Sequence, residues 1–149
     1  MARQAVRLVA HALPEREAVW WACMCVRHTA SADLPETDRL ALEAAETWVR
    51  RPSGESKQAS TTRAGAAEDK SPEVWVATAV AWTGTSTTPP DPRRRSPSRK
   101  VPGTAVVSSV VLASLRKTPM ASPVRLERFL RSARDIASGG SGRLPVETP

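Results

Sequence analysis

The stretch that most constrains the fold of this chain is residues 13–25, with the sequence LPEREAVWWACMC. Pro14 suits the first turn of a helix, where its missing N–H is no loss, and Glu15 and Glu17 favour the positive end of the helix dipole. The apolar residues that follow at helical spacing are Val19, Trp20, Cys23 and Met24. The pattern predicts a helix over residues 14–28, and we expect it to be the central core helix of a small bundle.

Tryptophan must supply most of the bulky core volume, because the chain has five tryptophans, one Phe and no Tyr. The tryptophans expected in the core are Trp20, Trp48 and Trp82. Trp21 points about 100° away from Trp20 on a helix, so we expect it at the edge of the core or partly exposed. One hypothesis makes Trp21 a hot spot for a partner, framed by Arg16 and Arg27. The other packs Trp21 against the first or last helix, the commoner role of a bulky apolar side chain.

Six further segments carry helix signals. The predicted ranges are 2–12, 36–51, 53–69, 72–83, 104–115 and 123–138. Asp33 and Glu36 have the spacing of a capping box, and Ser71 before Pro72 is a strong helix start. Gly84 stands where a left-handed C-terminal cap is expected.

Two of these segments are ambiguous in their pattern. Residues 53–69 are rich in Ser and Thr, contain Gly65 and lack a large apolar residue, so we expect a marginal helix on the outside of the bundle. Residues 104–115 contain four valines, which would also suit a buried strand. We predict a helix there because the neighbouring segments are helical and no partner strand is evident.

These segments predict an all-α fold, a single helical domain over residues 1–138 with about six or seven helices. A chain of 149 residues fits one such domain. Residues 85–103 are rich in Pro, Ser, Thr and Arg and are predicted to form a long disordered loop within the domain. Residues 139–149 are predicted to form a flexible tail.

The net charge of +7 permits contact with nucleic acid, acidic membranes or acidic proteins. The candidate anion contacts in the loop are Arg93, Arg94, Arg95, Arg99 and Lys100. This run lacks interleaved aromatic residues, so any binding of nucleic acid would be weak, non-specific and sensitive to salt. The alternative interpretation is a solvated loop that binds nothing.

The sequence predicts neither a metal site nor a disulfide. Cys23 and Cys25 lie about 200° apart on a helix, so they cannot face one another, and we expect buried thiols in a reducing cytosol. His11 and His28 have no ligand spacing. We expect His28 to interact with the dipole of the second helix instead.

No catalytic residue and no cofactor is predicted either. The chain has no Gly-x-Ser-x-Gly sequence, and the glycines of 139–142 follow a helix rather than precede one, which is the wrong order for phosphate binding. Arg16 and Glu17 are expected to form a buried contact that ties the second helix to a loop, rather than a catalytic dyad.

The segments near the N-terminus and around residue 110 bear on localisation. Arg3 and Arg7 interrupt the apolar pattern of residues 1–13, which therefore lacks the core of a signal peptide. The longest apolar run, 104–115, is too short to span a bilayer. We expect a cytoplasmic protein without a membrane span.

Four sequence pieces, taken in order, carry a resemblance. They are LPxREAVWWAC at 13–23, AAExWVxxPSxE at 44–55, WxA at 75–77 with AWxGxSxxPP at 81–90, and RFL at 128–130 with DIAxG at 135–139. With these pieces the chain resembles a family of small, uncharacterised bacterial proteins known only as a domain of unknown function. It departs from that family in its Ser- and Thr-rich 57–67 segment and in the arginine cluster after Pro90.

The resemblance implies a protein without enzymatic activity, often encoded beside type VI secretion components. We therefore expect a non-enzymatic accessory or adaptor protein with an unidentified protein partner. The alternative is a weak, non-specific binder of nucleic acid or anionic surfaces through residues 93–100.

Overall fold

The computed structural model describes residues 1–84 and 101–147, and within these residues the fold is all-α. Its elements are α1 (Ala2–Ala12), α2 (Glu15–Thr29), α3 (Glu36–Arg50), α4 (Gly54–Ala66), α5 (Pro72–Ala81), α6 (Pro102–Leu115), the short 3₁₀ helix η2 (Pro119–Ala121) and α7 (Ser122–Ala137). This confirms the predicted helical bundle. Residues 85–100, which include most of the predicted loop and all of its candidate anion contacts, lie outside the described residues.

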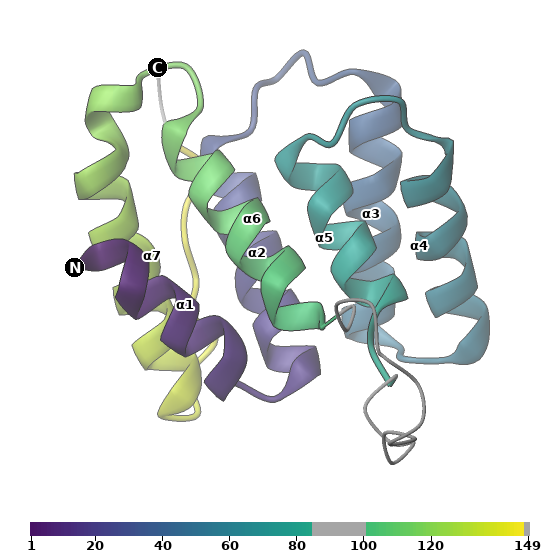
Figure 1. The fold of residues 1–149 in the computed structure, drawn as a ribbon, viewed down its shortest axis with the longest axis horizontal. Helices are drawn as coiled ribbons and strands as arrows, with labels where there is room; N and C mark the ends of the chain where they lie inside the picture. Colours follow the sequence, from purple (N-terminus) through teal and green to yellow (C-terminus); the bar gives the residue numbers. More distant parts are fainter. Residues whose placement is uncertain (85–100, 148–149) are drawn as a thin grey trace, which may run out of the picture.

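Two helices, α2 and α6, form the centre of the bundle (Figure 1). Helix α2 contacts α1, α3, α5, α6 and α7, and α6 contacts α1, α2, α5 and α7. On one side of this pair α3, α4 and α5 pack together, and on the other lie α1 and α7 (Figure 1). The central position predicted for the second helix is therefore confirmed. Helix α6 joins it there because its sequence, PGTAVVSSVVLASL, contains no charged residue and can be buried on several sides.

The assignment of the two adjacent tryptophans is the reverse of the predicted one. Trp21 is fully buried, whereas Trp20 is only partly buried. The predicted stripe through Trp20 and Met24 runs along the border of the buried face, whose centre follows Ala18, Trp21, Ala22 and Cys25. A helix with neighbours on several sides buries a wide face, so the largest side chains alone do not reveal its centre.

The other two predicted core tryptophans differ in burial. Trp48 of α3 belongs to the core and is 8% exposed, as predicted. Trp82 is partly buried and packs against the core cluster from its edge. Its ring meets that of Trp75 edge to face, with 6.3 Å between the ring centroids. Trp82 is therefore a peripheral core residue.

The predicted helix ends at Ser71 and Gly84 agree with the structure, because each depends on residues within one turn of the helix end. The Ser71 hydroxyl oxygen accepts a hydrogen bond from the Val74 backbone N–H at 3.2 Å, and Gly84 has a positive φ of 75°. The predicted Asp33 cap of α3 is wrong: the helix starts after Pro35, and the Asp33 carboxylate accepts a hydrogen bond from Ser31 instead. Because helix geometry is disfavoured just before Pro35, Asp33 stands too far from the first free N–H groups.

The Ser- and Thr-rich segment forms a helix, α4, on the outside of the bundle, where the sequence predicts it. Ser53 and Ser56 form a reciprocal capping box at its start. Ser60 is fully buried, and its hydroxyl donates to the Ala77 carbonyl of α5 at 3.2 Å. A buried hydrogen bond thus anchors a helix that lacks large apolar residues.

Residues 139–147 follow α7 in an extended path and return toward the C-terminal end of α2; we call them the return segment. The sequence predicts a flexible tail here, but in the structure Gly142, Pro145 and Glu147 of this segment are hydrogen-bonded to α2 and α7. The backbone N–H of Glu147 donates to the His28 carbonyl at 2.7 Å. The return segment is therefore held in place by polar contacts with two helices. The periodicity of apolar residues in the sequence gives no sign of such contacts.

No helix in the described ranges is long and apolar enough to cross a membrane.

Candidate binding groove beside the return segment

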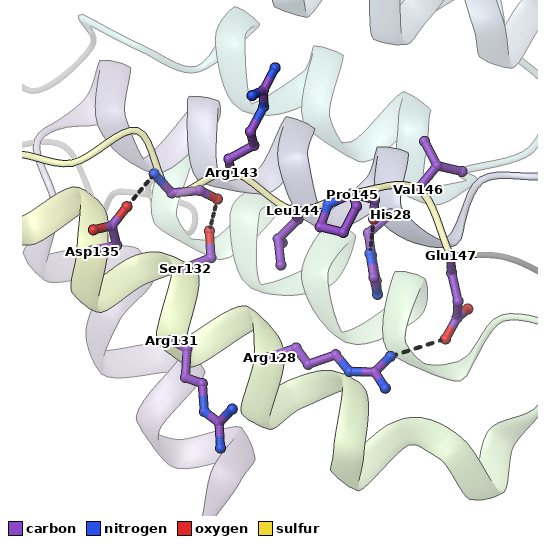
Figure 2. Close-up of a pocket in the computed structure, with 11 residues that line it drawn as sticks. His28, Arg128, Arg131, Ser132, Asp135, Arg143, Leu144, Pro145, Val146 and Glu147 are labelled. Atoms are coloured by element: carbon purple, nitrogen blue, oxygen red, sulfur yellow. Dashed lines mark hydrogen bonds and ion pairs between the residues drawn. The ribbon is translucent and has the colours of Figure 1, made fainter.

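An open groove with a volume of about 680 Å³ lies between α7 and the return segment, at the C-terminal end of α2 (Figure 2). Helix α2 contributes His28, and residues 142–147 form one wall. The lining side chains from α7 are Arg128, Arg131, Ser132 and Asp135. These positions are four, three or one residue apart, so they lie on neighbouring turns on one side of the helix.

The first attachment point of the return segment is Gly142. Its N–H donates to the Asp135 carboxylate at 2.8 Å, and its carbonyl accepts a hydrogen bond from the Ser132 hydroxyl (Figure 2). Gly142 has a φ of 65°, and a Cβ at this position would collide with the side chain of Ile136. Only glycine fits this turn without strain, because it has no side chain and adopts positive φ freely.

The second attachment point is Glu147. Its carboxylate accepts hydrogen bonds from Arg125 Nε at 3.2 Å and Nη2 at 2.8 Å, and lies 3.5 Å from Arg128 Nη1. Arg125 is only 4% exposed, and its Nη1 also donates to the carbonyls of Ser114 and Arg116 at the end of α6. A buried guanidinium therefore caps α6 and binds the return segment at the same time.

Arg125 was not predicted to be part of a site. Arg125, Arg128, Arg131 and Arg134 recur along the last helix in the sequence, a pattern typical of a solvated face, but in the structure Arg125 is buried. A signal existed in the spacing: Arg125, Phe129 and Ile136 recur at positions i, i+4 and i+11, and Phe129 and Ile136 are buried core residues. The charge of Arg125 favours a solvent-exposed position, whereas its spacing from Phe129 and Ile136 favours a buried one, and in the structure it is buried.

His28 lies in the last turn of α2, as the dipole interpretation requires, and is 4% exposed. Its Nδ1 is hydrogen-bonded to the Pro145 carbonyl (Figure 2). Because a carbonyl can only accept, Nδ1 carries the hydrogen, and in the neutral ring Nε2 is then unprotonated. Nε2 is buried and has no hydrogen-bond partner in the described part of the chain. The sequence does not predict the bond to Pro145.

The groove brings together His28, Ser132 and Asp135, the residue types of a nucleophilic triad. Such a triad needs hydrogen bonds from nucleophile to base and from base to carboxylate. Within residues 1–84 and 101–147 no such bond links these three side chains, and each is bonded to the return segment instead. In this arrangement all three side chains position a peptide segment.

The three predicted partner-binding residues lie elsewhere. Trp21 is buried, and its Nε1 donates to the Phe129 carbonyl of α7 at 2.8 Å, so packing against the last helix is correct and the exposed hot spot is wrong. Arg16 donates from Nε to the Val49 carbonyl at the end of α3 at 2.7 Å, instead of pairing with Glu17. Arg27 pairs with Glu46 at 2.5 Å, and this hydrogen bond raises the pKa of the guanidinium.

Arg16 and Arg27 therefore join α2 to α3, and neither lines the groove. Each of these arginines donates hydrogen bonds to a neighbouring helix. The charge of an arginine in the sequence does not reveal such a partner. The candidate anion contacts at 93–100 lie outside the described residues.

Cys23 and Cys25 are both buried and free, as the sequence predicts. Burial raises the pKa of both thiols, because the charged thiolate is poorly solvated inside the core. Among the described residues no group of three or more His, Cys, Asp or Glu side chains could hold a metal ion.

Acidification is expected to release the return segment. The hydrogen bond from Arg125 lowers the pKa of Glu147 below its ordinary value of 4.5. A carboxylate with a lowered pKa in the folded state contributes stability above pH 4.5 that is lost as the pH falls through the lowered pKa. NMR signals of the Glu147 and Gly142 amides should therefore shift toward those of an unstructured segment below pH 4.5.

The matched control for this titration is Glu147→Gln, which has no carboxylate to protonate. In that variant the amide signal of residue 147 should no longer shift over the same pH range. An unchanged shift at this position would show that another group controls the end of the segment.

The model of a family of unknown function, DUF6931, matches residues 1–137 of the chain. The matched range contains α1 to α7 and ends at the last residue of α7, just before the return segment. Comparison with curated proteins and with solved structures finds no match.

Proposed function

We propose that this chain, which belongs to the family of unknown function DUF6931, is a non-enzymatic adaptor that binds an acidic protein partner along the groove. The observation that carries the proposal is the basic, open wall of the groove. Arg131 is 76% exposed, Arg128 is about half exposed, and Arg143 of the return segment is exposed as well. Arginine is enriched at protein interfaces, where its planar head binds carboxylates.

Exposed apolar side chains lie near this surface. Val124 of α7 lies one turn before Arg128, and Met120 belongs to the preceding helix η2; both are exposed. Val146 of the return segment is exposed beside Glu147. Arginine together with exposed Met and Val is a composition suited to docking a protein.

The family resemblance supports a narrower proposal, in which the partner belongs to a type VI secretion system of the same bacterium and meets the adaptor in the cytoplasm. The pieces that support it are the LPxREAVWWAC segment of α2 and the later motifs through DIAxG. The product of a neighbouring gene would then be the acidic partner.

The test is capture of partners from the native cell by the tagged full chain, with a charge reversal on the groove. Arg131→Glu with Arg143→Glu should weaken binding of the captured partner at least tenfold. Its matched control is Arg3→Glu with Arg7→Glu, which changes the net charge equally on the exposed side of α1 and should leave binding within twofold. Equal loss in both variants would show that net charge, not the groove, binds the partner.

The runner-up function is weak binding of nucleic acid or anionic surfaces through residues 93–100, which is supported by five cations in eight residues and a net charge of +7. This function predicts binding without sequence preference that weakens steeply with added salt. Capture that resists nuclease but is lost on charge reversal in the groove would support the adaptor function, whereas capture that nuclease abolishes and the reversal leaves intact would support the runner-up.

A further inference from the structure

The return segment is held in the way a bound peptide ligand is held. Its contacts with the helices are mainly polar and fall at two points, Gly142 and the stretch from Pro145 to Glu147. Val146 is 63% exposed, and Leu144 is the apolar residue of the segment that packs, partly buried, against the core. The segment therefore adds little apolar burial to the bundle that receives it.

The groups that receive the segment are built into the helical body. His28 and Arg125 are each 4% exposed, and both present hydrogen-bond donors to it, Nδ1 of His28 to a carbonyl and the guanidinium of Arg125 to a carboxylate. The His28 carbonyl accepts the Glu147 N–H as well. Buried, oriented polar groups of this kind form a preorganised recognition site, because their rotamers are held by the surrounding packing.

The groups that hold the return segment lie inside the range matched by the family model, whereas the segment itself lies outside it. His28, Arg125, Ser132 and Asp135 lie within the 1–137 range matched by the family model, and the return segment lies beyond it. The connection between them is the sequence Ser138-Gly139-Gly140-Ser141-Gly142, in which Gly139 and Gly142 have φ of 91° and 65°. A connection rich in glycine can take up many other backbone conformations when the segment detaches.

We propose that the surface formed by His28, Arg125 and Arg128 is a recognition site for an extended acidic segment of a partner protein. Residues 145–147 of the return segment occupy this site until the partner displaces them, while Arg143, next to the Gly142 attachment, stays in the wall of the groove. This inference rests on the proposed adaptor function and names the partner's chemistry. The segment must present a carbonyl to His28 Nδ1 and, two residues later, a backbone N–H to the His28 carbonyl and a carboxylate to the two arginines. The return segment meets these requirements with Pro145 and Glu147.

Competition between the tethered return segment and a partner segment for the same site sets the apparent affinity for the partner. A tethered segment with a short flexible connection is present at an effective concentration of the order of millimolar. A partner segment therefore binds weakly while the return segment is docked, and more tightly when the tethered carboxylate is removed. Partners with further contacts to Val124 and Arg131 would overcome the competition.

The experiment uses a fluorescein-labelled peptide with the sequence of residues 140–149, GSGRLPVETP, added to the full-length chain. Glu147→Gln in the protein removes the competing carboxylate and leaves the receiving groups intact, so the dissociation constant of the peptide should fall at least tenfold relative to wild type. A peptide with Gln in place of its Glu should bind this variant at least tenfold more weakly than the acidic peptide. Adding Arg128→Gln to the Glu147→Gln protein should weaken binding several-fold.

Equal binding of the peptide to wild type and to Glu147→Gln, or no binding to either at millimolar peptide, would overturn the proposal. A concentration-dependent dimer that Glu147→Gln abolishes would also overturn it, since the site would then receive the segment of a second copy. If the captured partner depends on Arg131 and Arg143 but the peptide fails, the adaptor function stands without this inference. If the peptide binds and no partner depends on the groove, the adaptor function is the part that fails.

Discussion

Trp21→Ala is expected to lower the free energy of unfolding by about 3–5 kcal/mol, the range for removing a buried aromatic side chain. Trp21 is fully buried between α2 and the last helix, and the change also leaves the Phe129 carbonyl without the indole N–H that donates to it at 2.8 Å. Denaturant unfolding followed by circular dichroism measures this loss directly. A loss of this size is a large fraction of the total, since domains of this kind are stable by about 5–15 kcal/mol.

Its neighbour supplies the matched control, because Trp20→Ala removes the same number of atoms from a partly exposed position of the same helix. That variant should be clearly more stable than Trp21→Ala. Trp21→Phe keeps most of the volume and loses the hydrogen bond, with an expected cost of about 1–3 kcal/mol. A larger loss for Trp20→Ala than for Trp21→Ala would mean that the orientation of α2 described above is wrong.

Arg116→Met is expected to lower the free energy of unfolding by about 3–5 kcal/mol, because it leaves a buried carboxylate without its cation. Glu73 in the first turn of α5 is fully buried, and its Oε1 accepts a hydrogen bond from Arg116 Nη2 at 2.6 Å. In the described residues Glu73 Oε2 and Arg116 Nη1 are buried without hydrogen-bond partners. The pair therefore joins α5 to the end of α6 through a single hydrogen bond.

The double variant Glu73→Leu with Arg116→Met should regain most of this loss, since apolar residues of similar size often replace a buried ion pair without cost. Arg131→Met is the exposed control; it breaks the Glu127–Arg131 pair on the surface of α7 and should change stability by less than about 1 kcal/mol. A double variant as unstable as Arg116→Met alone would show that the pair is not the source of the effect. Thermal and denaturant unfolding of the three variants decide between these outcomes.

Both predictions concern residues whose roles lie between helices, and the same is true of the groove. Of the predicted site residues that the structure describes, Arg16, Trp21 and Arg27, none lines it, because all three point from α2 toward α3 or α7. Four residues that hold the return segment, His28, Arg125, Ser132 and Asp135, come from two helices about a hundred residues apart in the chain. Spacing within one helix cannot detect such a combination, since it depends on how the helices cross.

The sequence by itself determined the local structure of this protein. Proline at helix starts, Ser71 as a cap, Gly84 and Gly139 in positive φ and apolar repeats of helical period act within one or two turns, so the all-α class and the helix ranges follow from them. The prediction that Cys23 and Cys25 are buried and unpaired is confirmed. Their lack of a mutual disulfide also follows from local geometry, since two residues at this spacing on a helix point to different sides.

Only the tertiary structure decided which side of each helix is buried and what the polar groups bind. Helix α2 has neighbours on so many sides that the burial of Trp21 over Trp20 depends on the position of α7. Arg125 is buried because the end of α6 and the Glu147 carboxylate reach it together, and the return segment is ordered because those partners exist. Such contacts join residues distant in sequence, and their free energy arises only when the helices have packed.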